Sequence, residues 1–130
     1  MERTKMEPVG NVADLPWEDG SVLRGAREFQ IMELVANDPT YTKAFSLEYV
    51  RISRNGHSVT HVNSCSHFLY VLDGVGEITI EDRTWPLRAG SYARVKGGKR
   101  HSLRNQGDGD MYVLAVYDPP RVTDTSTKVG

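Results

Sequence analysis

All four histidines in this chain lie in two glycine-punctuated stretches, and three of them are the residues best suited to carry chemistry. His61 and His67 follow Gly56, and His101 follows Gly90. Neutral imidazole is the commonest protein ligand for mid-to-late first-row divalent metals. Three converging imidazoles would hold one metal ion and leave positions open for water, dioxygen or substrate. The sequence therefore predicts a small metalloenzyme.

Short strands must position these histidines. Runs rich in β-branched and aromatic residues predict strands at 45–52, 68–72, 77–81 and 111–117, with polar or glycine-rich turns between them. An imperfectly alternating run at 28–35 predicts another strand, with a short helix as the alternative. Such short strands at near-regular spacing are typical of an all-β sandwich or barrel.

Length, charge and cysteine content limit the classes of protein to which the chain can belong. A chain of 130 residues fits one domain, with an arm expected at 1–27, a barrel at 28–120 and a polar tail at 121–130. The formal net charge of -1 gives no basic footprint, so we expect no nucleic-acid partner. Cys65 is the only cysteine, so no intramolecular disulfide can form and a reducing cytoplasm is the expected location.

Nothing in the sequence predicts a membrane partner. The segment 1–8 lacks the apolar core of a signal peptide. No run approaches the roughly 20 apolar residues that are needed to cross a bilayer. Although Cys65 lies between two candidate ligands, we expect a packed and inert residue there. We therefore expect a cytoplasmic protein that acts on a small molecule.

The stretch that carries His101 resembles the second motif of the cupin family, the double-stranded β-helix or jelly-roll barrels. The matching positions are Gly90, Gly98, His101 and Asn105. The one departure is Lys96, which stands where the family usually has proline. Gly97 and Gly98 are interpreted as turn residues with positive φ rather than as a phosphate-binding loop, because no helical pattern follows them.

The first cupin motif is matched with two substitutions, and four residues instead of the usual five separate Gly56 from the first histidine. After Gly56, His61 stands at its first histidine, Asn63 at its second histidine and His67 at its usual glutamate. The resemblance implies an all-β cupin barrel with a metal bound by His61, His67 and His101. Asn63 is a weak, neutral candidate to bind the metal or the substrate. His57 is expected to be a surface residue.

Three imidazoles without a carboxylate would leave the metal its full charge. That charge favours anionic substrates and lowers the pKa of bound water. Iron is the favoured metal, and zinc, nickel, copper and manganese are the alternatives. The resemblance to three-histidine iron cupins implies an iron-dependent dioxygenase. The alternatives are a redox-neutral lyase, isomerase or cyclase, a metal-free acid–base enzyme and a non-catalytic ligand-binding cupin.

Several other side chains are candidates to contact the substrate. Half of the side chains on a barrel strand face inward, and an inward arginine is costly unless it meets an anion. Arg94 stands where cupins commonly have an apolar residue, so it is the candidate to bind a substrate carboxylate, with an outward, solvated side chain as the alternative. Tyr70 is a candidate proton donor and Tyr49 a candidate substrate contact, and either residue could merely pack. Because Glu48 is adjacent to Tyr49, at most one of these two can face inward.

The resemblance also implies a homodimer. Cupins of this size often pair through sheet faces or swapped N-terminal strands. Trp17 and Trp85 are expected to pack at the barrel ends or to contact a second copy.

Overall fold

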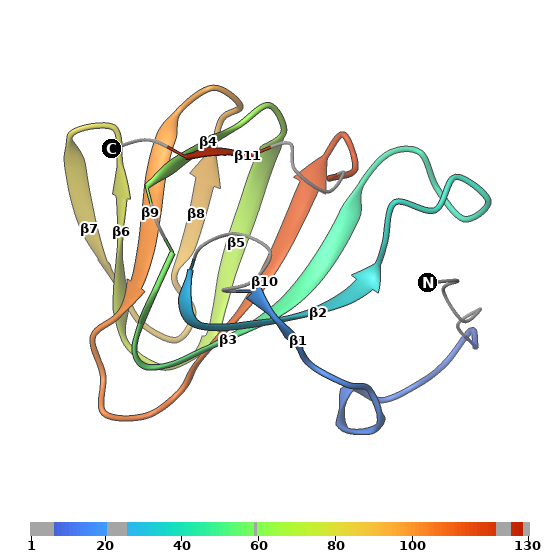
Figure 1. The fold of residues 1–130 in the computed structure, drawn as a ribbon, viewed down its shortest axis with the longest axis horizontal. Helices are drawn as coiled ribbons and strands as arrows, with labels where there is room; N and C mark the ends of the chain where they lie inside the picture. Colours follow the sequence, from blue (N-terminus) through green and yellow to red (C-terminus); the bar gives the residue numbers. More distant parts are fainter. Residues whose placement is uncertain (1–6, 21–25, 59, 122–125, 129–130) are drawn as a thin grey trace.

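A computed structural model shows the chain as a curved sheet around one apolar core (Figure 1). It describes residues 7–20, 26–58, 60–121 and 126–128. The elements in chain order are the 3₁₀ turn η1 (Val12–Asp14) and the strands β1 (Glu18–Asp19), β2 (Arg27–Val35), β3 (Ser46–His57), β4 (His61–Asn63), β5 (Ser66–Asp73), β6 (Gly76–Ile80), β7 (Arg83–Leu87), β8 (Tyr92–Val95), β9 (Arg100–Asn105), β10 (Met111–Asp118) and β11 (Ser126–Lys128).

The strands pair across long sequence separations. Hydrogen bonds join them in the order β11-β4-β9-β3-β10-β5-β8, while β2 pairs with β3 and β6 pairs with β9. All of these pairs are antiparallel. The sheet bends until it is a nearly closed barrel, which confirms the predicted all-β fold class.

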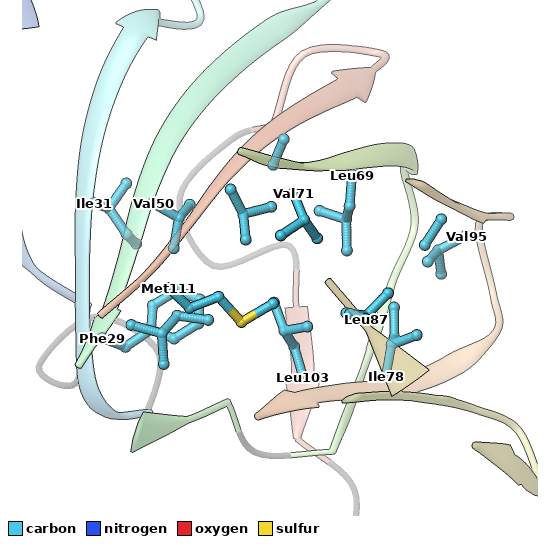
Figure 2. Packing of buried hydrophobic residues seen from close by; sticks show 14 of the residues in the cluster. Phe29, Ile31, Val50, Leu69, Val71, Ile78, Leu87, Val95, Leu103 and Met111 are labelled. Carbon is cyan, nitrogen blue, oxygen red and sulfur yellow. The ribbon is translucent and has the colours of Figure 1, made fainter. Parts of the chain in front are cut away.

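The inward faces of the strands build the core. On β5, Leu69 and Val71 are buried, whereas Phe68 and Tyr70, which alternate with them, are exposed. Figure 2 shows the inward side chains converging on the space between the strands, with Met111 near the middle. The residues labelled there are Phe29, Ile31, Val50, Leu69, Val71, Ile78, Leu87, Val95, Leu103 and Met111. Burying one such side chain contributes roughly 1.5–3 kcal/mol.

The run at 28–35 is a strand rather than a short helix. It belongs to β2, which pairs with β3 over most of its length. Phe29 and Ile31 face the core, and Met32 on the opposite side is also buried, which explains the imperfect alternation. No helix in the described ranges has the length and hydropathy needed to cross a membrane.

Segments near both ends of the chain add strands to the sheet. β1 pairs with β2, with Glu18 opposite Ile31. Within the segment predicted to be a polar tail, Ser126–Lys128 forms β11 and pairs with β4, which carries His61 (Figure 1). A strand edge presents unpaired backbone groups, so even a short polar segment can pair with it.

Candidate metal centre

The barrel brings together the three histidines that were predicted as ligands. The ring centroids of His61 and His101 are 4.2 Å apart, and those of His67 and His101 are 4.6 Å apart. His61 and His101 are cross-strand partners on β4 and β9, whereas His67 comes from β5. His67 and His101 are buried and His61 is half-buried. Three strands therefore contribute one imidazole each to a single cluster.

Hydrogen bonds and a close backbone contact hold the loops beside this cluster. The Gly97 N–H donates to Ser66 Oγ at 3.0 Å, and the Gly98 N–H donates to the Asn63 carbonyl at 2.9 Å. The predicted positive φ is confirmed for Gly98, at 89°. The same prediction is wrong for Gly97. A Cβ there would lie 2.5 Å from the Ser64 carbonyl oxygen, so this glycine permits a close approach of two backbones.

A hydrogen bond fixes the tautomer of the neutral His101 ring. Its Nδ1 lies 3.0 Å from the Lys99 carbonyl oxygen. A carbonyl can only accept, so Nδ1 donates and the neutral ring carries its lone pair on Nε2. Burial, and to a smaller extent the neighbouring His61, lower the pKa of His101 to about 4, although the hydrogen bond to Lys99 opposes the shift. The ring is therefore neutral near pH 7, as a metal ligand must be.

The cluster fits a divalent transition metal in the chemistry of its donors. Imidazole nitrogen suits iron, zinc, nickel and copper. The contact between His101 Nδ1 and a backbone carbonyl is the kind of outer interaction that orients metal-binding histidines. However, no three His, Cys, Asp or Glu side chains within the described ranges form a group ready to hold an ion. The ring planes of His101 and its two neighbours are inclined at 58° and 55°. Because the described residues hold no ready group, metal binding requires some of these side chains to reorient.

Most other predicted site residues lie away from the histidines. Asn63 on β4 is buried, with 2% of its surface exposed. Tyr70 is 41% exposed on the outer face of β5, so its side chain points away from the core. Arg94 takes the outward, solvated orientation, which was the alternative to an inward one. The alternation of β8 directs the apolar Ala93 and Val95 into the core and leaves Arg94 in solvent.

Tyr49 belongs to an aromatic cluster on the outer face of β3 and β10. Its ring centroid lies 5.3 Å from that of Trp17 and 5.8 Å from that of Tyr112. The Arg51 guanidinium carbon lies 4.5 Å from the Trp17 ring centroid. Burial raises the pKa of Tyr49, Tyr112 adds to the rise and Arg51 opposes it. Tyr49 therefore packs the N-terminal arm against the sheet and is not near the histidines.

The structure adds three residues that sequence reasoning did not assign to the site. The Tyr117 ring is stacked on His67 at 5.0 Å. The Arg121 guanidinium carbon lies 5.6 Å from the Tyr117 ring centroid, and Arg121 Nη1 lies 4.0 Å from Glu48 Oε2. The parity of β3 is a signal for Glu48, because an outward Tyr49 requires an inward Glu48. Arg121 has no such signal, since it follows the last predicted strand.

Comparison with known proteins identifies the family. The chain belongs to the cupins, because residues 48–117 match the cupin domain. It is similar to the polyketide cyclase RemF from Streptomyces resistomycificus, with a TM-score of 0.80, 23% identity and coverage of 96% of this chain and 87% of that chain. None of the curated proteins matches the sequence.

Two further solved structures share the fold. A predicted oxalate decarboxylase from Thermotoga maritima has a TM-score of 0.77 and 22% identity, over 85% of this chain and 98% of that chain. KdgF from Halomonas sp. has a TM-score of 0.71 and 17% identity, over 84% of this chain and 90% of that chain. At these identities the likeness shows a common fold.

Proposed function

We propose that this chain is a metal-dependent cupin enzyme that acts on a small polar or anionic molecule. His61, His67 and His101 would hold one divalent transition metal. The clustering of three imidazoles from three strands, at centroid distances of 4.2 and 4.6 Å, carries this proposal.

The chain's own residues would orient the ion and limit its contact with water. The three imidazoles offer neutral nitrogen donors, and Tyr117 stacks on one face of His67. Val95 stands opposite His67 across β5 and β8 and is buried. When bound, a divalent metal would supply Lewis acidity toward a substrate oxygen.

We favour redox-neutral chemistry, such as a lyase, isomerase or cyclase reaction. The similarity to a polyketide cyclase and to a predicted oxalate decarboxylase supports this choice. A buried arginine and carboxylate near the histidines also suit a substrate whose oxygen becomes negative during reaction. Iron-dependent dioxygenation is the second candidate, because three imidazoles without a carboxylate also suit iron and oxygen.

Proton exchange tests the choice of reaction class. The probe is 2-oxobutanoate in D₂O, with metal-loaded protein under argon, and proton NMR follows the loss of the C3 signal. We expect the wild type to accelerate this exchange without oxygen and His101→Ala to be inactive, whereas His57→Ala should behave as the wild type. No exchange under argon, together with oxygen uptake by the iron-loaded protein in air, would replace our choice with dioxygenation.

A further inference from the structure

His67 is flanked by a buried residue on each neighbouring strand. β5 lies between β10 and β8 in the sheet (Figure 1). Tyr117 of β10 stands opposite His67 on one side, and Val95 of β8 stands opposite it on the other. All three side chains are buried. The backbone of His67 is therefore fixed from both edges of its strand, and its side-chain torsions set where its nitrogens point.

The ring of Tyr117 lies over the ring of His67. Their centroids are 5.0 Å apart and their planes are inclined by 25°, which is a stacked arrangement. Aromatic rings at this separation attract each other, and a stacked pair favours one relative orientation. The lone pair of a neutral imidazole lies in the plane of its ring, so the orientation of that plane decides where a metal can bind. A ring stacked on His67 therefore helps to set the direction of its donor nitrogen.

The chain after β10 contacts the Tyr117 ring in turn. The Arg121 guanidinium carbon lies 5.6 Å from the centroid of that ring, and a cation near an aromatic ring is attracted to it. The Arg121 N–H donates to Ser46 Oγ at 2.8 Å, and Ser46 is the residue opposite Tyr117 on β3. Tyr117 thus contacts Arg121 as well as His67, and its buried ring has little freedom to leave the imidazole.

We propose that Tyr117 is a positioning residue that sets the plane of the His67 imidazole for metal binding. The inference rests on the proposed function, because it concerns one of the three histidines that would hold the metal. The Lys99 carbonyl has the corresponding role for His101. Replacing a residue that orients a metal ligand typically weakens metal binding by about 10–100-fold.

Zinc affinity, measured by competition with a chromophoric chelator, tests this role. Tyr117→Leu removes the stacked ring but keeps an apolar side chain, and it should weaken zinc binding by about tenfold. Tyr117→Phe keeps the ring and should retain wild-type affinity. Tyr112→Leu is the matched control, because Tyr112 also lies on β10 and stacks on another ring, that of Tyr49, away from the histidines. It should leave the zinc affinity unchanged.

Cobalt-loaded protein separates positioning from a loss of stability. The visible absorption bands of bound Co²⁺ depend on the arrangement of its ligands, so they report the orientation of His67 and not the free energy of unfolding. We expect altered band positions in Tyr117→Leu, and wild-type bands in Tyr117→Phe and Tyr112→Leu. Wild-type bands in Tyr117→Leu would overturn the inference.

If Tyr117→Leu does not fold, the wild type decides. Proton NMR should show nuclear Overhauser contacts between the rings of Tyr117 and His67 in both the metal-free and the zinc-loaded protein. Loss of these contacts on zinc loading would overturn the inference, because the stack would then open for metal binding. A wild type that binds neither zinc nor cobalt would contradict the proposed function as well, whereas metal binding that is indifferent to Tyr117→Leu would overturn this inference alone.

Discussion

His61 and His101 are direct cross-strand partners, with ring centroids 4.2 Å apart. The two imidazole rings differ in their burial and in the elements that hold them. His101 is buried and bonded to the Lys99 carbonyl, whereas His61 is half-buried on β4, a strand of three residues between β9 and β11. His61 is therefore the imidazole that is best placed to reorient when a metal binds.

The close approach at Gly97 predicts that a single methyl group will disturb the site. A Cβ in Gly97→Ala would lie 2.5 Å from the Ser64 carbonyl oxygen, so the loops beside the histidines must separate. We expect a loss of about 1–3 kcal/mol in the free energy of unfolding, measured with urea. Gly109→Ala is the control, because nothing lies within 4 Å of its Cβ position. Equal stability of the two variants would contradict this account.

Asn105, the last residue of the second motif, should be needed for folding stability. Its Nδ2 donates to the Ile52 and Gly109 carbonyls, and its Oδ1 accepts from the Gly107 N–H, each at 2.8 Å. Asn105→Ala removes these partners and should cost about 2–3 kcal/mol. The exposed Gln106 supplies the control, and Gln106→Ala should change stability by less than about 0.5 kcal/mol. Thermal unfolding that does not distinguish the two variants would refute this role.

The metal-free protein should gain stability as the pH rises from about 4 to 6.5. The folded pKa of His101 is lowered from 6.5 to about 4, so the unfolded chain binds more protons than the folded chain between these values. This contribution is fully present above the unfolded pKa and is lost as the pH falls toward the folded pKa. Its size is on the order of 3 kcal/mol.

Urea unfolding of chelator-treated protein at several pH values measures this effect. His101→Gln should depend less on pH than the wild type, whereas His57→Gln should follow the wild type. If His101→Gln retains the full pH dependence, then another group is responsible.

The outer face of β5 and β8 leads us to propose that the protein is a homodimer. Phe68, Tyr70, Leu72 and Tyr92 are 42%, 41%, 42% and 66% exposed there, and the rings of Phe68 and Tyr92 stack. An apolar face suits twofold pairing with a second copy, because the same surface meets itself and needs no complementary charge. We expect light scattering to give twice the chain mass for the wild type and for Tyr41→Glu, an exposed control, but the chain mass for Tyr92→Glu. A wild-type monomer would contradict the proposal.

The strands could be predicted because a barrel buries alternate side chains, and that alternation is visible in β5 and β6. The proximity of His67 and His101 could be predicted from the resemblance to the two cupin motifs. The inward arginine could not be predicted. Arg94 lies within a strand but faces solvent, and Arg121 enters the barrel end from a segment without a hydrophobic pattern. Pairing of β11 with β4 depends on backbone groups, which leave no signal in the side chains.

Metal content of the wild type and of single histidine variants tests the central claim most directly. Protein purified without chelators or a metal-binding tag would be analysed for each transition element. We predict about one equivalent in the wild type and in His57→Ala, and little metal in His61→Ala, His67→Ala and His101→Ala. Full occupancy in His67→Ala, or a wild type that binds no transition metal, would contradict the three-histidine site.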